Sequence, residues 1–295
     1  MNALSEPREV LECMKRGGYY DTVMAAGSEL DRVKAYLKAM DSGLDSSKMA
    51  AQQLPTYPAF PGLRHQEFHP AENIDATPLL ENACETVHSE GEALLRDKEY
   101  LDYFHRGKQT TSADSFWSIG LLYYMGVALD RDIHCKETLK LVNALPGVCI
   151  DYPWGDALFS LQRGHSRLPA HCSVDALRVR CHLGLQIPDD CGIRVGAESR
   201  RWRKGSVLCF EDSYEHEVWN NSTQDRLVLI VDCWHPDLTI IEREALTAGF
   251  RKSEVRNVFY DKRLNNTNAD NELKDFLDHK IKEQDRDPLI SRYWR

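Results

Sequence analysis

Apolar and polar side chains alternate along residues 177–187, which read LRVRCHLGLQI. Because successive side chains of a strand point to opposite faces, this pattern predicts a strand with one apolar face. Arg178, Arg180 and His182 then share the other face. Burying such residues is costly unless anions or a metal accompany them, so this face is expected to line either a functional site or solvent.

Polar residues with useful chemistry recur at the ends of the neighbouring predicted strands. Apolar runs at 207–210 and 227–231 predict two more strands, and strands are expected to dominate residues 157–234. His171 precedes the first strand, His216 follows the second, and Arg226 opens the third. Residues that several strand ends bring together are the usual makeup of a site in a small β-barrel.

Helical spacing of apolar residues appears on both sides of these strands. It predicts two short helices within residues 7–45 that Gly17 and Gly18 separate, then helices at 76–98, 137–145, 240–250 and 272–283. Residues 46–64 and 263–271 are interpreted as loop and linker. The predicted fold class is mainly β with helical additions. The expected divisions are a helical N-terminal extension at 1–50, a catalytic domain at 51–250 and a helical tail at 251–295.

Composition narrows the functional classes. The 295 residues carry a net charge of −9, which argues against nucleic-acid binding as the main function. No apolar run reaches the roughly 18 residues of a membrane span, and the first 15 residues are charged, so we expect a cytoplasmic protein without a membrane partner. Nine cysteines without CxxC spacing indicate reduced, packed thiols. The basic residues around Trp202 are expected to form a solvated turn.

A larger set of motifs spans roughly residues 100–245. It comprises Ser160, His171, Arg180-Cys181-His182-Leu183-Gly184, the strand at 205–210, His216-Glu217-Val218-Trp219-Asn220, Arg226 and Val231-Asp232-Cys233-Trp234-His235-Pro236. In order and in nearly all spacings, this set resembles the aspartyl/asparaginyl β-hydroxylase family. The resemblance implies a double-stranded β-helix of the cupin or jelly-roll type, flanked here by N- and C-terminal helices. It also implies a dioxygenase that uses Fe(II), the cosubstrate 2-oxoglutarate and O2.

The resemblance also implies roles for individual residues. His171 and His216 match the family's two iron ligands, and neutral imidazole is a suitable ligand for divalent iron. Ser160, His182 and Arg226 match residues that bind 2-oxoglutarate, where a planar guanidinium suits a carboxylate. Arg178 and Arg180 match positions that face the cosubstrate and the substrate carboxylate; sequence does not divide these two duties between them.

One position departs from the family pattern. Where the family usually reads His-x-Gly, this chain reads His171-Cys172-Ser173, so a hydroxyl is added that would stand beside an iron-bound water. Most oxygenases of this type add a carboxylate ligand, whereas this family leaves the third position to water. Asp175 follows His171 by four residues, a spacing that disfavours it as that third ligand.

The substrate is less determined than the chemistry. Two arginines besides Arg226 favour a small carboxylate-bearing substrate, such as an amino acid or its derivative, which would undergo hydroxylation or oxidative cyclisation. Aspartyl or asparaginyl hydroxylation of a peptide or protein is the alternative. A cupin-like barrel that binds a metal or ligand without oxidising anything is a second alternative. The retained ligand set argues against this last reading. His235 is expected to be structural, at the end of the last core strand.

Overall fold

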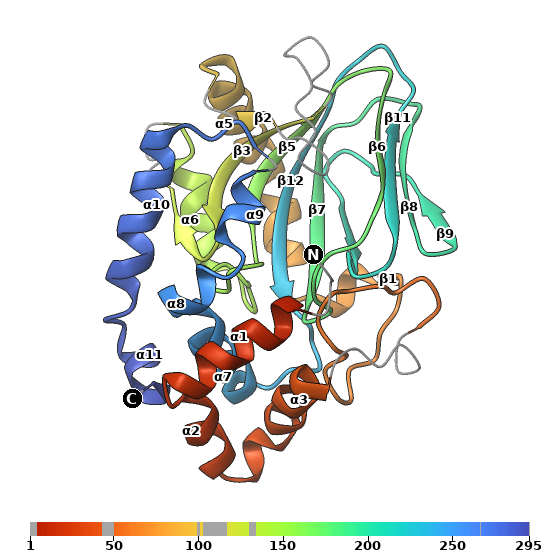
Figure 1. Ribbon diagram of the computed structural model, residues 1–295. Coiled ribbons are helices and arrows are strands. Elements are labelled where there is room, and N and C mark those ends of the chain that lie inside the picture. The colour runs from red at the N-terminus through yellow and green to blue at the C-terminus, as the bar shows by residue number, and fades with distance from the viewer. Residues whose placement is uncertain are drawn as a thin grey trace.

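Two antiparallel sheets form the centre of the molecule in the computed structural model, which describes residues 5–42, 50–98, 101–102, 117–129, 134–265 and 267–294 (Figure 1). Residues 43–49 and 266, on which parts of the predicted loop and linker fall, lie outside the described residues. The larger sheet has the order β1-β10-β7-β12-β5-β3-β2, and β4 pairs with β3. Its strands are β1 (Phe68–His69), β10 (Val207–Phe210), β7 (Arg178–Gln186), β12 (Arg226–Trp234), β5 (Ala157–Gln162), β3 (Trp117–Tyr124), β2 (Leu101–Asp102) and β4 (Val127–Ala128).

The smaller sheet has the order β6-β11-β8-β9. Its strands are β6 (Ser166–His171), β11 (His216–Asn220), β8 (Cys191–Val195) and β9 (Glu198–Arg200). Chain segments therefore alternate between the two sheets, as in a double-stranded β-helix. The predicted predominance of strands over residues 157–234 is confirmed.

Strand β7 has the two faces that its sequence pattern predicts. Val179, Cys181 and Leu183 are buried in an apolar cluster that includes Val87 and Leu94 of helix α5 (Cys84–Arg96). The face with the charged residues therefore lies on the other side, between the two sheets. Strand β7 lies between β10 and β12 in the larger sheet. The alternation of its side chains therefore determines which of them point into the centre of the barrel.

Helices α4 (Thr77–Asn82), α5 and α6 (Lys136–Ala144) cover the outer face of the larger sheet. A Cβ atom at Gly91 of α5 would lie 2.5 Å from the ring of Phe159, so this close approach requires glycine. The single helix predicted over 76–98 is two helices, because Ala83 between them has a ψ of 3° that interrupts the helix. The helix predicted at 137–145 is confirmed.

The N-terminal and C-terminal helices pack together at one end of the sheets (Figure 1). They are α1 (Ser5–Arg16), α2 (Tyr19–Ala25), α3 (Asp31–Ser42), α7 (Ile240–Arg251), α8 (Ser253–Arg256) and α11 (Pro288–Tyr293). Helices α9 (Tyr260–Leu264) and α10 (Asn271–Gln284) lie beside the larger sheet, where α10 contacts β4 (Figure 1). The hydroxyl of Tyr19 donates to the carbonyl of Ala245 at 2.6 Å, and Trp294 Nε1 donates to the carbonyl of Ala248 at 2.7 Å. Gly18, with φ of 74°, separates α1 from α2, and α2 is an additional helix that the apolar spacing missed.

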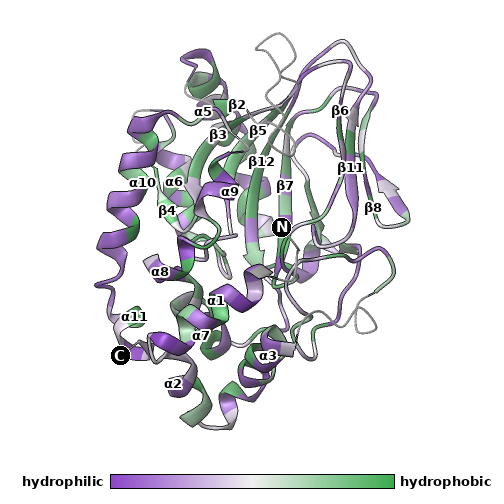
Figure 2. Ribbon diagram, viewed as in Figure 1, coloured by the Kyte–Doolittle hydropathy of each residue, from purple (hydrophilic) through white to green (hydrophobic). Residues whose placement is uncertain are grey.

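Apolar residues concentrate in the central strands, and polar residues cover the peripheral helices. Figure 2 shows apolar colouring along β3 and β5 and polar colouring along much of α10. Helix α7 begins with a capping box, in which Thr239 accepts from the backbone N–H of Glu242 while the Glu242 carboxylate accepts from that of Thr239. Within the described part of the chain, no helix is both long enough and apolar enough to cross a membrane.

Candidate active site

His171 and His216 are cross-strand neighbours in the smaller sheet. They pair between β6 and β11, and their ring centroids lie 4.1 Å apart. Nδ1 of His171 bonds the carbonyl of Pro169 at 2.8 Å, and Nδ1 of His216 bonds the carbonyl of Tyr214 at 2.9 Å. Each bond places the imidazole proton on Nδ1, so Nε2 is the nitrogen that each ring offers to a metal.

His216 is suited to metal binding by its protonation state. Burial lowers the pKa of His216 to about 4, so the ring is neutral at pH 7. Among the described residues, the only group of three or more His, Cys, Asp or Glu whose ligand atoms lie within 4.8 Å of one another is elsewhere, at His65, Glu211 and His235. Within that limit the histidine pair therefore has no protein carboxylate as third ligand.

Asp175 is held away from any role as a ligand. Its carboxylate accepts hydrogen bonds from Tyr152 Oη, from the backbone N–H of Leu177 and from Arg178 Nη1 at 2.8–3.1 Å. Burial raises the pKa of Asp175, and the charge of Arg178 opposes this shift. The residue belongs to a buried ion network with Arg178.

Arg226 is a buried cation without an anionic partner among the described residues. Its Nη2 donates to Ser160 Oγ at 3.4 Å, while Nε and Nη1 have no hydrogen-bond partner. Burial lowers the pKa of Arg226 to about 10, so the guanidinium still carries its charge at pH 7. Buried polar groups are normally satisfied, and these two orphaned donors fit a carboxylate ligand.

His182 and Trp202 extend the same site. The indole Nε1 of Trp202 donates to His182 Nδ1 at 3.3 Å, and the two rings stack with an interplanar angle of 13°. Burial, together with the charges of Arg226 and Arg180, lowers the pKa of His182 well below its usual value. The neutral ring therefore has its proton on Nε2, which has no hydrogen-bond partner and is a donor for a further oxygen.

The sequence alone did not identify Trp202 as a residue of the site. Its basic neighbours Arg201, Arg203 and Lys204 are exposed, as a solvated turn requires, but Trp202 itself is buried. The guanidinium of Arg226 lies over its ring. A single tryptophan within a charged turn could have indicated this burial, because a large apolar side chain is usually buried even where its neighbours are exposed.

Arg178 and Arg180 are bound by carboxylates of the chain itself. Arg178 contacts Asp175, Asp212 and Asp232, and its Nη2 also donates to Ser173 Oγ at 2.5 Å. Arg180 contacts Asp232 at 2.8 Å, Asp212 at 3.3 Å and Asp156 at 3.6 Å. Every guanidinium nitrogen of Arg178 has an acceptor, so this arrangement does not support its predicted role toward a substrate carboxylate.

Ser173, the residue that departs from the family pattern, takes part in this network. Its backbone N–H donates to the carbonyl of Asp212 at 2.7 Å, and its hydroxyl accepts from Arg178. The hydroxyl was predicted to stand beside an iron-bound water. Its contact with Arg178 instead makes it an anchor for that guanidinium.

One cavity between the sheets collects most of the predicted site residues. It is lined by Trp117, Ser160, Gln162, Leu168, His171, Arg180, His182, Ile193, Phe210, His216, Val218, Arg226 and Ile230. Of the residues predicted from sequence, Ser160, His171, Arg180, His182, His216 and Arg226 are present and Arg178 is absent from this lining. The two imidazoles with Nε2 toward the cavity at one side and a cation with orphaned donors at the other fit Fe(II) and 2-oxoglutarate respectively.

Residues 81–236 match the sequence model of the family described as Aspartyl/Asparaginyl beta-hydroxylase. The chain belongs to this family. It is 30% identical over 201 residues to aspartate beta-hydroxylase domain-containing protein 2 of Xenopus tropicalis, over 67% of this chain and 52% of that protein. It is 42% identical over 95 residues to the aspartyl/asparaginyl beta-hydroxylase of Homo sapiens, over 32% of this chain and 12% of that protein.

The chain spans about half the length of the domain-containing relatives that it matches. Among solved structures, a prolyl-4-hydroxylase from Pseudomonas putida is similar at 15% identity with a TM-score of 0.36, over 59% of this chain and 92% of that chain. The cupin domain of Schizosaccharomyces pombe Cnp3 is similar at 15% identity with a TM-score of 0.24, over 28% of this chain and 57% of that chain. In this member of the β-hydroxylase family, the two sheets between which the chain alternates form a double-stranded β-helix.

Proposed function

We propose that this chain is an Fe(II)- and 2-oxoglutarate-dependent dioxygenase that hydroxylates the β-carbon of an aspartyl or asparaginyl residue in a peptide or protein. The observation that carries the proposal is the buried guanidinium of Arg226, with two orphaned donors, in the same cavity as the His171 and His216 pair. Family membership supplies the reaction class, and this geometry supplies a binding position for each participant.

His171 and His216 would bind the iron through Nε2. Their backbone hydrogen bonds at Nδ1 fix both ring orientation and tautomer, which strengthens each ring as a ligand. When bound, iron and 2-oxoglutarate with O2 supply the oxidant: the 2-oxo acid becomes succinate and CO2, one oxygen atom enters succinate, and the other replaces a C–H bond with C–OH.

Arg226, Ser160 and His182 would orient the cosubstrate. Arg226 suits the distal carboxylate of 2-oxoglutarate, because its Nε and Nη1 donors have no competing acceptor. Ser160 Oγ accepts from Trp117 Nε1 at 2.7 Å, which leaves its own O–H to donate to the same carboxylate. His182 Nε2–H is a third donor, and the cavity around it is lined partly by Leu168, Ile193, Val218 and Ile230, which exclude water.

The arginine network changes which substrate is favoured. A small carboxylate substrate was predicted because Arg178 and Arg180 were expected to offer free positive charge. Four aspartates, Asp156, Asp175, Asp212 and Asp232, already neutralise both residues. The names of the relatives favour an aspartyl or asparaginyl residue, so the peptide reading now leads and the small amino acid becomes the alternative.

The test is a succinate assay under controlled metal loading. Anaerobically purified protein receives Fe(II) and 2-oxoglutarate, then O2 together with either a library of peptides containing Asp and Asn or a pool of free acidic amino acids. We expect peptide-stimulated succinate and a peptide product heavier by one oxygen atom, and we expect neither from His216→Ala. Turnover of free amino acids alone would overturn the peptide substrate. No succinate from iron-loaded protein with either set would favour the binding-only barrel.

A further inference from the structure

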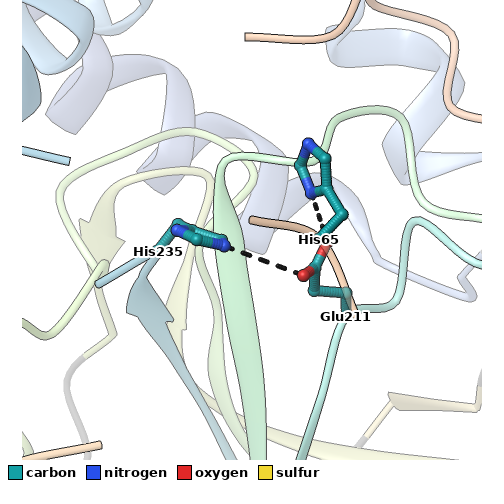
Figure 3. Close-up of side chains that lie close together, drawn as sticks. All are labelled: His65, Glu211 and His235. Carbon is teal, nitrogen blue, oxygen red and sulfur yellow. Dashed lines mark hydrogen bonds and ion pairs between the residues drawn. The ribbon is translucent and has the colours of Figure 1, made fainter. Parts of the chain in front are cut away.

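A second histidine-rich group lies outside the cavity described above. We call it the Glu211 cluster; it comprises Glu211, His65, His69 and His235. His65 precedes β1 and His69 ends it, Glu211 follows β10, and His235 follows β12. Figure 3 shows His65 and His235 directed from separate segments toward the Glu211 carboxylate.

Glu211 is a fully buried carboxylate that remains ionised. Its Oε1 accepts from His69 Nε2 and from the backbone N–H of Gln66, both at 2.9 Å. Its Oε2 contacts His65 Nδ1 at 2.7 Å and accepts from Gln53 Nε2 at 3.3 Å. Burial opposes ionisation, but the contacts with His235, His65 and His69 outweigh it and hold the pKa of Glu211 well below the usual range.

The spacing of three members suits a tetrahedral metal ion. Within the part of the chain that the structure describes, His65, Glu211 and His235 form the one group of this kind with ligand atoms within 4.8 Å of one another. Glu211 lies 2.7 Å from His65 Nδ1 and 3.7 Å from His235 Nε2. Zinc with bonds of about 2.0–2.2 Å requires its N and O ligands to be about 3.3–3.6 Å apart. The short distance joins His65 to Oε2 and the long one joins His235 to Oε1, so binding through one oxygen requires the His65 ring to move outward and the His235 ring to move inward.

His235 supplies an independent indication. The residue is 1% exposed, and its Nε2 has no hydrogen-bond partner, although it points toward Glu211 (Figure 3). Its Nδ1 accepts from the backbone N–H of Asp237 at 3.1 Å, and the Asp237 carboxylate lies 3.9 Å from the same nitrogen. On metal binding the ring proton would move from Nε2 to Nδ1. This move breaks the hydrogen bond from the Asp237 N–H and leaves the Asp237 carboxylate as the acceptor toward which Nδ1 would shift.

We infer that His65, Glu211 and His235 form a binding site for a divalent metal ion of the zinc type, separate from the His171 and His216 pair. His69 and Gln66 orient Glu211, since Gln66 Nε2 donates to His69 Nδ1 at 2.9 Å and so fixes the His69 proton on Nε2. An adjoining cavity of about 550 Å³, lined by Arg64, Asn73 and Pro236 as well as the histidines, gives solvent access to the fourth position.

The bound ion would join the segment at 64–69 to the ends of β10 and β12. This junction adjoins the active cavity: Phe210, before Glu211, lines that cavity, and Asp212, after it, binds Arg178 and Arg180. The inference therefore concerns a structural metal ion next to the candidate active site. It stands whether or not the chain oxidises a peptide.

The test is metal stoichiometry of the full chain by equilibrium dialysis against Zn(II), with Co(II) absorption as a spectroscopic probe. A double variant, His171→Ala with His216→Ala, should retain one equivalent of Zn(II) and give the visible bands of tetrahedral Co(II). Adding His65→Gln or His235→Gln should weaken Zn(II) binding at least about tenfold. His279→Gln, at a surface histidine paired with Glu283, is the matched control and should leave binding unchanged.

A second measurement covers the case in which the double variant does not fold. The wild-type chain should bind two equivalents of Zn(II) and His65→Gln one, and Zn(II) should raise the thermal midpoint of wild type more than that of His65→Gln. The inference is overturned if wild type binds no Zn(II). It is also overturned if folded His65→Gln and His235→Gln bind as much Zn(II) as His279→Gln.

Discussion

The guanidinium of Arg226 lies over the indole ring of Trp202, with 4.7 Å from Cζ to the ring centroid. A cation over an aromatic face is stabilised without being neutralised, unlike a cation beside a carboxylate. The charge of Arg226 thus stays available for an incoming anion, whereas the charges of Arg178 and Arg180 are matched within the fold. This contrast separates the arginine suited to ligand binding from the two that support the site.

Replacing Arg226 should therefore act mainly on the cosubstrate. We expect Arg226→Ala to raise the KM for 2-oxoglutarate about 10- to 100-fold, because a hydrogen bond to a charged group contributes about 1.5–3 kcal/mol. The KM of Arg226→Lys should fall between that of wild type and that of Arg226→Ala, since lysine keeps the charge and loses the planar pair of donors. Succinate formation against 2-oxoglutarate concentration measures the effect, and an unchanged KM in Arg226→Ala would remove the assignment.

The Asp232 carboxylate compensates two buried cations at once. Asp232→Asn should lower the free energy of unfolding by about 3 kcal/mol or more, because removing one partner of a buried ion pair leaves uncompensated charge. Urea denaturation followed by circular dichroism measures this loss. The matched control is the exposed Asp189→Asn, for which we expect a change within about 0.5 kcal/mol. Equal stability of the two variants would contradict the compensation described here.

Ser173→Gly tests the residue that departs from the family pattern. Loss of its bond to Arg178 should cost about 1 kcal/mol of stability, while iron binding should stay normal. Because the hydroxyl bonds to Arg178, we expect the ratio of products to be unchanged. Product analysis by mass spectrometry provides the check. A shifted ratio would mean that Ser173 acts on the reacting group.

The pairing of Arg64 with Asp237 predicts a specific dependence of stability on pH. The hydrogen bond from Arg64 is the main cause that lowers the pKa of Asp237 to about 2, from a usual value of 3.8. A carboxyl with a depressed folded-state pKa stabilises the fold above its unfolded pKa, and this contribution disappears as the pH falls through the folded value.

Asp237→Asn should thus reduce stability at pH 5 by at most about 1 kcal/mol, because Arg64 is well exposed and solvent screens the pair. Between pH 4 and pH 2 the variant should lose stability less steeply than wild type. Urea unfolding at several pH values measures both slopes, with Asp189→Asn again as control. Parallel slopes for wild type and Asp237→Asn would contradict the pKa shift.

The parts of the fold that local sequence determines were predictable. Alternation along β7 placed Arg178, Arg180 and His182 on one face, and the structure has them there because the opposite face packs against α5. Local pattern does not reveal which residues meet across the fold. Three of the four aspartates that bind the two arginines, Asp156, Asp212 and Asp232, are distant in sequence, so the substrate prediction rested on charges whose partners were mostly unknown.

The same limit explains the other differences. Trp202 donates a hydrogen bond to His182 and packs under Arg226, so a turn that is charged in sequence contributes a residue that supports the site. The break at Ala83 depends on how α4 and α5 each pack on the sheet. The helical periodicity of residues 76–98 carries no information about this packing. The Glu211 cluster unites residues from three segments, and no two of its members are close enough in sequence to form a recognisable metal motif, apart from His65 and His69.

The two halves of the candidate site stand on different sheets. His171 and His216 belong to the smaller sheet, whereas Ser160, His182 and Arg226 belong to the larger one. The spacing between the proposed metal ligands and the proposed carboxylate-binding arginine is thus a sheet-to-sheet distance, set by apolar side chains such as Leu168, Val218 and Ile230. A methyl group gained or lost at one of these positions would change the length of cosubstrate that the cavity accepts, so selectivity can diverge while every polar residue is retained.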